Sequence, residues 1–358
     1  MSINPRMPAE MKNFLMGAWK DPKVIKRLEE EASKQICLAT SGTTGIPKWV
    51  VLSEKAILIS AKAVNNHLES NSSDVWFHTL PDFHVGGLGI MARSSLSGAA
   101  VIKSSFPEGR WDPVHFVEQL AMSGATLTAL VPTQVFDLVM KGLQSPLFLR
   151  AVIVGGGALS DKLYSDAKIL GWKLLPSYGL TECSSQVATA CHQSANLTPL
   201  DHVELALELD GRLKIRSEAL LTAYIDCSQD DYRWRDPKVD GWFTTEDYAV
   251  LEDGKIKTIR RNVDFVKIGG ESVDLNRLRR ILEEEALTLR WQTDMTLVAL
   301  PDDRLGHIIC LKSVRSESDI TQLVDKYQQR VLPFERIRNI DYVESIPRSP
   351  LGKVFTSP

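Results

Sequence analysis

Predicted strands and helices alternate between about residues 75 and 175, and this alternation constrains the fold more than any other feature of the sequence. A parallel sheet covered by helices is the architecture that such an alternation predicts. Ligands of such sheets gather at the carboxyl ends of the strands, where His84, Gly156 and Tyr178 fall. The predicted strands are Val75–Leu80, Ala99–Lys103, Thr126–Val131, Ala151–Val154 and Lys173–Leu175.

Helix boundaries are marked by capping residues. Ser53, Asp112 and Ser160 each precede a helical pattern as N-cap candidates, and Asp112 is followed by a proline. Gly124 ends the second of these helices. A stretch of small residues at about 88–97 predicts a further helix.

The pattern changes beyond residue 203. The Asp210-Gly211 and Asp253-Gly254 pairs lie between short apolar runs and predict hairpins. We therefore expect residues 203–260 to form a mainly antiparallel subdomain, followed by a compact α+β stretch. The expected fold class is α/β, with a large domain over residues 1–260, a hinge at 261–264 and a small mobile domain at 265–358.

A loop rich in Ser, Thr and Gly joins two apolar runs at residues 39–48. Gly42 and Gly45 let the backbone approach a ligand closely, and hydroxyls together with Lys48 are suited to phosphate oxygens. The Walker A pattern is excluded, because Trp49 follows the lysine where that pattern needs a hydroxyl. The alternative interpretation is an ordinary polar turn.

The loop resembles the nucleotide-binding signature of the acyl-adenylate-forming superfamily, and four later segments resemble its other motifs in the right order. The resemblance implies ATP, Mg²⁺ and coenzyme A as ligands. It implies that the loop binds ATP through Thr40, Ser41, Gly42, Thr43, Thr44 and Lys48, of which Thr43, Thr44 and Lys48 hold the β- and γ-phosphates.

The second motif is Ser177-Tyr178-Gly179-Leu180-Thr181-Glu182. The resemblance implies that the Tyr178 ring lies against adenine, that Thr181 contacts the α-phosphate and that Glu182 holds Mg²⁺. A flat ring, a hydroxyl and a carboxylate suit these three ligands. Gly156 and Gly157 resemble the stretch whose backbone borders adenine, and a Rossmann interpretation fails because Ser160 occupies the third glycine position.

The remaining motifs concern ribose and the small domain. Asp247 and Arg261 resemble the residues that bind the ribose hydroxyls, and a carboxylate with two acceptor oxygens suits a vicinal diol. Val263 stands where the hinge acid usually sits, with Asp264 next to it, so the pivot stays open between them. Lys353 resembles the lysine of the adenylation step, because Pro347 and Gly352 have the family's spacing around it.

Three stretches, at residues 80–93, 130–134 and 178–185, together resemble the o-succinylbenzoate–CoA ligases of menaquinone biosynthesis. This substrate is an aromatic acid with two carboxylates, one to be activated and one to be held by cationic or donating groups. The resemblance implies that His84 lies beside the activated carboxylate, and Arg93, Thr133 and Ser185 are the candidates for the other. Another acyl- or aryl-CoA ligase, a carrier-protein-loading adenylation domain and a non-catalytic nucleotide-binding homologue remain as alternatives.

Composition excludes several other classes. The net charge of −3 and the lack of a Lys/Arg-rich run give no nucleic-acid footprint. No stretch reaches signal-peptide or membrane-spanning length, and the five cysteines form no C-x-x-C pair, so we expect a cytoplasmic protein with reduced thiols and no membrane insertion. The loop begins near residue 40, so an N-terminal subdomain is expected to be shortened, which leaves a homodimer open.

Overall fold

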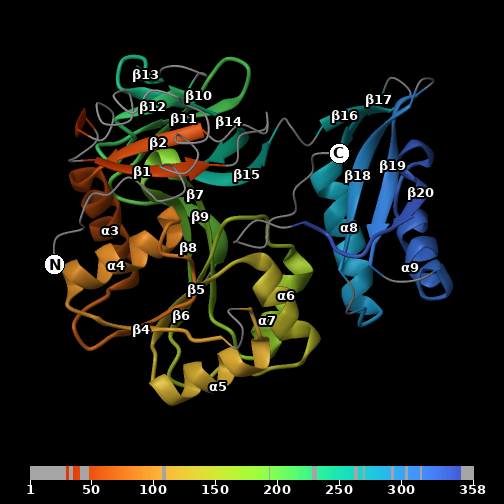
Figure 1. Cartoon of the computed structure of the whole chain (residues 1–358), viewed down its shortest axis with the longest axis horizontal. Coiled ribbons are helices and arrows are strands. Elements are labelled where there is room, and N and C mark those ends of the chain that lie inside the picture. Colours follow the sequence, from red (N-terminus) through yellow and green to blue (C-terminus); the bar gives the residue numbers. More distant parts are fainter. Residues whose placement is uncertain are drawn as a thin grey trace.

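The computed structural model describes most of the chain (Figure 1). The described residues are 30–31, 35–40, 48–106, 110–192, 194–227, 232–261, 265–268, 271–291, 294–302, 305–314 and 317–347. Asp21-Pro22, an N-cap and proline pair that predicts the start of a helix ending near Lys34, therefore lies outside them.

The predicted parallel sheet is confirmed. Its strands pair in the order β4, β3, β5, β6, β7, each parallel to its neighbour. Every residue of β5 and β6 is buried, as expected for strands covered on both faces. The strands are β3 (Val75–His78), β4 (Ala100–Lys103), β5 (Leu127–Leu130), β6 (Ala151–Val154) and β7 (Leu174–Leu180).

Helices cover both faces of this sheet (Figure 1). On one face α3 and α4 bury Val64 and Ile90 against Trp76, whereas on the other face α5, α6 and α7 bury residues such as Phe116 against Phe77. Adjacent residues of β3 thus point to opposite layers. The helices are α3 (Glu54–Leu68), α4 (Val85–Ser97), α5 (Pro113–Ser123), α6 (Pro132–Met140) and α7 (Asp161–Ile169).

The predicted N-caps are confirmed. Ser53 and Ser160 accept hydrogen bonds from backbone N–H groups of α3 and α7, and Asp112 accepts two from α5. Gly124 follows α5 in the left-handed conformation, at φ 63°. The helix expected at about 88–97 instead begins at Val85, because the backbone at His84 is already extended as an N-cap and the following glycines continue the helix.

The two predicted Asp-Gly hairpins do not form a sheet of their own. They continue the parallel sheet beyond β7, so that eleven strands are joined in one sheet. Both Asp-Gly hairpins are confirmed as the β10–β11 and β14–β15 connections. The added elements are η2 (Thr181–Cys183), β8 (Ser185–Cys191), β9 (Ser194–Pro199), β10 (Glu204–Leu207), β11 (Arg212–Arg216), β14 (Trp242–Glu252) and β15 (Lys255–Arg261).

A second sheet has the order β1, β2, β12, β13, and all of its strands are antiparallel. It places the two strands that flank the Ser/Thr/Gly loop beside a hairpin from far along the chain. Its strands are β1 (Gln35–Thr40), β2 (Lys48–Ser53), β12 (Ala223–Cys227) and β13 (Tyr232–Arg235).

The C-terminal elements lie beside the larger body and have their own apolar core, to which α8, α9 and a three-stranded sheet contribute (Figure 1). The helices expected at 275–287 and 319–330 and the strands expected at 296–300 and 307–314 are confirmed, with ends that differ by at most two residues. The elements are β16 (Phe265–Ile268), β17 (Glu271–Asp274), α8 (Leu275–Thr288), β18 (Met295–Asp302), β19 (Gly306–Ser313), α9 (Glu317–Gln329), η4 (Pro333–Glu335) and β20 (Ile337–Tyr342).

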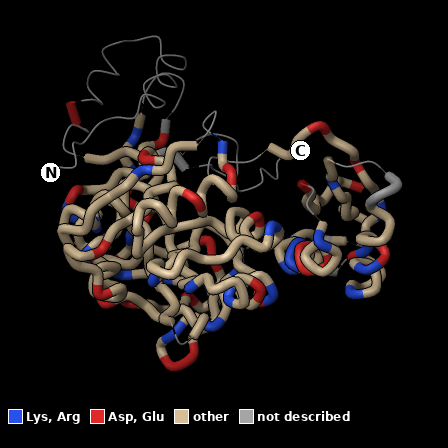
Figure 2. The backbone as a smooth tube through the Cα atoms, turned by 90° about the horizontal axis from the view of Figure 1, so that it is seen from below, with Lys and Arg blue, Asp and Glu red and all other residues tan. Residues whose placement is uncertain are grey.

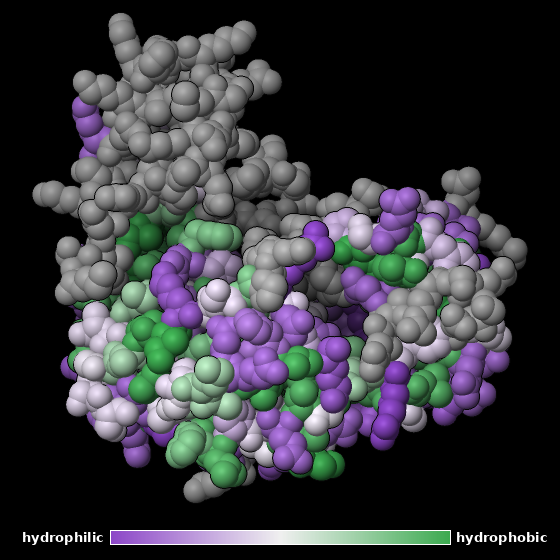
Figure 3. All heavy atoms as spheres, turned by 60° about the horizontal axis from the view of Figure 1, so that its bottom comes forward, coloured by the Kyte–Doolittle hydropathy of each residue, from purple (hydrophilic) through white to green (hydrophobic). Residues whose placement is uncertain are grey.

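Charged residues of both signs are interspersed along the described backbone (Figure 2). Hydrophobic and hydrophilic side chains also mix over the face shown in Figure 3. Among the described residues, no helix is both long enough and apolar enough to cross a membrane. The four described cysteine side chains form no disulfide bond in the structure.

Candidate active site

The expected strand–loop–strand arrangement around the Ser/Thr/Gly loop is confirmed for its two strands. β1 and β2 pair antiparallel, with Thr40 opposite Lys48 at the end nearest the loop. Residues 41–47, and with them Ser41, Gly42, Thr43 and Thr44, lie outside the described residues, as do the side chains of Thr40 and Lys48. Their contacts with phosphate remain predictions.

Tyr178 of the second motif and Asp247 of the ribose motif are in direct contact. The Tyr178 hydroxyl donates a hydrogen bond of 2.8 Å to Oδ2 of Asp247, which is only 5% exposed. Asp247 lies inside β14 and pairs across the strands with Arg261. The structure thus brings together an aromatic ring, a carboxylate and the backbone that carries an arginine.

The glycines of the site adopt conformations or contacts that other residues resist. Gly156 follows β6 with a φ of 80°, and Gly157 packs near Pro132 at the start of α6. Gly179 is the most constrained, because a Cβ there would lie 1.9 Å from the carbonyl oxygen of Ser185. The backbones of β7 and β8 therefore approach each other too closely at this position for any side chain.

Gly179→Ala is therefore expected to destabilise the protein by about 1–3 kcal/mol, since the backbone on both sides of the contact would have to move apart. The free energy of unfolding in urea measures this effect. Gly155→Ala is the matched control, because a Cβ there would meet its nearest neighbour at an ordinary 3.6 Å. Equal losses in the two variants would show that this contact does not constrain position 179.

Glu182 follows β7 in the short helix η2, beside Thr181. The hydroxyl of Tyr224 donates a hydrogen bond of 2.9 Å to Oε1 of Glu182. Tyr224 comes from β12, in the other sheet, and no sequence motif indicated it. Ser177, on β7, bonds through its hydroxyl with Thr189 of the neighbouring strand, at 3.2 Å.

His84 lies at the N-cap of α4 and is half-buried. Its Nδ1 is buried and has no partner among the described residues. Burial lowers the pKa of His84, so the ring is neutral at neutral pH and can accept or donate a hydrogen bond. Behind it, the buried His78 bonds with Asp82 at 2.7 Å, and Asp82 also contacts Lys103. These three groups fix the turn that carries His84.

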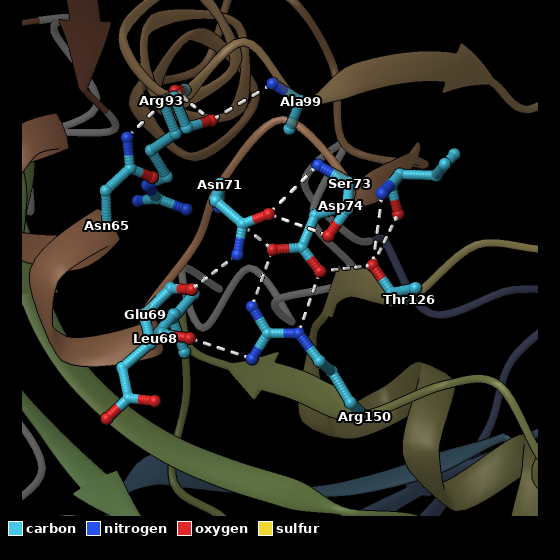
Figure 4. A network of polar contacts seen from close by, with 12 residues as sticks. Asn65, Leu68, Glu69, Asn71, Ser73, Asp74, Arg93, Ala99, Thr126 and Arg150 are labelled. Atoms are coloured by element: carbon cyan, nitrogen blue, oxygen red, sulfur yellow. Dashed lines mark hydrogen bonds and ion pairs between the residues drawn. The ribbon is translucent and has the colours of Figure 1, made fainter.

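Arg93, on α4, is 2% exposed and is the largest cationic side chain in the core (Figure 4). Its Nη2 donates a hydrogen bond of 3.4 Å to the hydroxyl of Ser185, and its guanidinium lies 5.6 Å from the ring centroid of Trp76. No carboxylate pairs with it within the described part of the chain, and its Nε has no partner. Burial lowers the pKa of Arg93 to about 10.

An uncompensated buried cation is costly unless an anion joins it. The guanidinium also lies close to Gly89, where a Cβ would stand 3.1 Å from Nη2. Ser185 links this cation to the hairpin that carries Tyr178 and Gly179, because it pairs with Leu180 across that hairpin. The charge and the unpartnered donor make this position, next to the second motif, chemically suited to an anion.

Thr133 is the second residue of α6 and is half-buried. Within the described residues it has no hydrogen bond to Arg93 or Ser185, so the structure brings together two of the three candidates for the second carboxylate. Lys353 and the hinge positions Val263 and Asp264 lie outside the described residues.

Comparison with known proteins identifies the class. Residues 18–217, more than half of the 358-residue chain, match the family described as AMP-binding enzyme. The chain therefore belongs to the AMP-binding enzyme family, and the superfamily expected from the motifs is confirmed.

Similar curated proteins are named 2-succinylbenzoate–CoA ligase. The one from Listeria monocytogenes is 27% identical over 350 residues, which cover 94% of this chain and 71% of the relative. The one from Escherichia coli is 30% identical over 280 residues, which cover 75% of this chain and 56% of the relative.

Solved structures agree with the fold. Bacillus subtilis o-succinylbenzoate CoA synthetase in complex with the acyl-adenylate OSB-AMP has a TM-score of 0.75 at 22% identity, covering 90% of this chain and 68% of that one. An E. coli MenE variant with bound OSB-AMS has a TM-score of 0.68 at 25% identity, covering 86% and 64%. The chain thus spans between 56% and 71% of the length of these four relatives.

Proposed function

We propose that the chain is an ATP-dependent ligase that activates o-succinylbenzoate as an acyl-adenylate and transfers the acyl group to coenzyme A. The family membership and the names of the relatives support this proposal. The observation that carries it is the buried guanidinium of Arg93, which has no carboxylate partner in the described part of the chain. A substrate with two carboxylates would supply that partner.

The acid would lie between His84 and Arg93. The benzoate carboxylate pairs with Arg93 and accepts the Ser185 hydroxyl, which is already within 3.4 Å of the guanidinium. The succinyl carboxylate then reaches the turn at His84, whose neutral ring can position it for attack. Thr133 borders the same pocket from α6 in this proposal.

The nucleotide would occupy the carboxyl end of the sheet. The Tyr178 ring and the backbone of Gly156 and Gly157 border adenine, while Asp247 and Arg261 bind the ribose. The Tyr178–Asp247 hydrogen bond supports this assignment, because it places the aromatic ring and the proposed diol acceptor side by side. The loop residues Thr40, Ser41 and Gly42 would border the nucleotide, and Thr43, Thr44 and Lys48 would hold its β- and γ-phosphates.

Glu182 fits a magnesium ion that arrives with ATP. Its carboxylate is half-buried, and Tyr224 orients it through Oε1. No cluster of three potential metal ligands occurs among the described residues, which suits an ion bound by one carboxylate and by substrate phosphates. When bound, Mg²⁺ would neutralise phosphate charge.

Tyr224→Phe is expected to lower kcat/KM for MgATP about tenfold or more, because a hydrogen bond to a charged group contributes about 1.5–3 kcal/mol. Steady-state kinetics at varied Mg²⁺ measures the loss and the Mg²⁺ concentration for half-maximal rate. Tyr164→Phe, on α7, is the control and should change neither. A loss of the same size in both variants would contradict the role of Tyr224.

The reaction proceeds in two steps. The succinyl carboxylate oxygen attacks the α-phosphorus, the bond from that phosphorus to pyrophosphate breaks, and Lys353 stabilises the charge that develops there. The CoA thiol then attacks the acyl carbon and AMP leaves with the carboxylate oxygen. We further propose that residues 261–264 are the hinge between a large domain (1–260) and a small one (265–358), which moves Lys353 between the steps.

Product analysis tests the proposal. The protein with o-succinylbenzoate, MgATP and CoA should form one thioester, one AMP and one pyrophosphate per turnover. The matched control acid lacks the ring carboxylate and should react much more slowly. Formation of the acyl-adenylate without any thioester would instead indicate an enzyme that loads a carrier protein.

A further inference from the structure

A cavity of about 440 Å³ opens at the amino end of the parallel sheet, where β6 and β7 begin. Lys173 and Tyr178 are five residues apart along an extended chain, so this cavity and the candidate active site are about 16 Å apart. The cavity is therefore separate from the site proposed for ATP. Its lining residues are Arg150, Tyr164, Lys168, Gly171, Trp172, Lys173, Leu174 and His192.

Four of these residues are basic and none is acidic. Lys168 lies with its ammonium 5.5 Å from the ring centroid of Tyr164. Lys173 donates to the carbonyl oxygen of Leu149 at 3.0 Å, which occupies one of its three N–H donors. Both lysines are exposed, and neither has an ion pair among the described residues. Two uncompensated positive charges thus border the cavity.

Arg150 also lines the cavity, but its guanidinium is already paired with a carboxylate, unlike the ammonium groups of the two lysines. Its Nε and Nη2 donate to the two carboxylate oxygens of the buried Asp74 at 2.8 and 2.7 Å, and its Nη1 donates to the carbonyl of Leu68 at 2.8 Å (Figure 4). Thr126 also donates to Asp74, at 2.7 Å. This network compensates the charge of Arg150 and holds its side chain in place at the edge of the cavity.

The pKa of His192 reflects the positive charges around the cavity. Its pKa is lowered by burial first and then by the positive charges of Arg150 and Lys173 and by His67. Two acidic groups, Asp74 and Glu69, act on Arg150. An imidazole in such surroundings becomes protonated more easily once an anion enters, and it then adds a third donor.

We propose that this cavity is a second anion site, which binds the phosphate group of a small molecule between Lys168, Lys173 and His192. Phosphate matches it because its oxygens accept hydrogen bonds from two ammonium groups and an imidazolium at once. The volume exceeds that of inorganic phosphate alone, so a phosphate monoester is accommodated as well. The proposal does not depend on the ligase activity.

Proton NMR of the histidine rings tests it, because the His192 signal separates this site from any phosphate bound at the nucleotide loop. His192→Gln identifies that signal among the seven histidines. Inorganic phosphate and glycerol phosphate are titrated separately, each against sodium chloride at equal ionic strength. We expect a saturable shift of the His192 signal and a raised pKa of His192 with at least one of the two ligands. The ligand that binds more tightly shows whether the site prefers free phosphate or a phosphate monoester.

Lys168→Gln/Lys173→Gln should weaken the binding at least tenfold, because two charges are lost from around the anion. Lys162→Gln is the control, since Lys162 lies on the same helix but pairs with Asp166 at 3.0 Å. Thermal unfolding checks that each variant is folded, and the single variant Lys168→Gln repeats the test at one exposed position. A shift no larger than that caused by chloride, or unchanged affinity in the lysine variants, would overturn the proposal.

Discussion

Replacing Arg93 by methionine is expected to lower kcat/KM for o-succinylbenzoate by roughly a hundredfold or more. Removing one partner of a buried charge pair costs about 3–5 kcal/mol, because the other charge is left unpaired. At about 1.4 kcal/mol per tenfold, this is at least two orders of magnitude. An acid without the ring carboxylate should lose far less in the same variant, and the two acids with the two proteins form a double-mutant cycle.

Stability provides the control for this prediction. Without substrate the guanidinium of Arg93 is buried beside Trp76 and Ser185 and has no carboxylate partner in the described part of the chain, so methionine should leave the free energy of unfolding within about 1 kcal/mol. Urea denaturation measures it. Near-additive losses in the kinetic cycle, or a large loss of stability, would show that Arg93 is structural and does not bind the second carboxylate.

Lys353→Ala is expected to affect only the first step. It should abolish ATP–pyrophosphate exchange, because the charge at the α-phosphate is then unbalanced, yet leave thioester formation from supplied acyl-adenylate largely intact. The two half-reactions are measured separately. Lys326→Ala, on α9, is the control and should alter neither. Equal loss of both half-reactions would remove Lys353 from the adenylation step.

Local signals in the sequence predicted most of the fold. Ser53, Asp112 and Ser160 cap helices through short-range hydrogen bonds, so they act within a few residues and can be identified from the pattern. The continuation of the parallel sheet into the antiparallel hairpins could not be predicted, because it depends on pairing of β9 with β15 across a long separation. Local periodicity does not specify such partners.

In the candidate active site, too, local motifs identified individual residues but not the contacts between distant segments. The motif resemblance pointed to Tyr178, Asp247 and Glu182, and the family match confirms the class to which those motifs belong. The motifs did not indicate Tyr224, whose hydroxyl contacts Glu182 from a strand of the other sheet. The sequence identifies Arg93 and Ser185 as candidates for the second carboxylate, but it does not predict that they are in contact. The contact joins a helix to a strand that begins 92 residues after Arg93, and local patterns carry no information over that separation.

ATP–pyrophosphate exchange over a panel of carboxylic acids tests the central claim most directly. The panel should contain o-succinylbenzoate, its analogue without the ring carboxylate, benzoate, and fatty and amino acids. Exchange should be fastest with o-succinylbenzoate and should fall steeply when the ring carboxylate is absent. Faster exchange with a monocarboxylic acid would contradict the substrate assignment, and no exchange with any acid would contradict the assignment as a ligase.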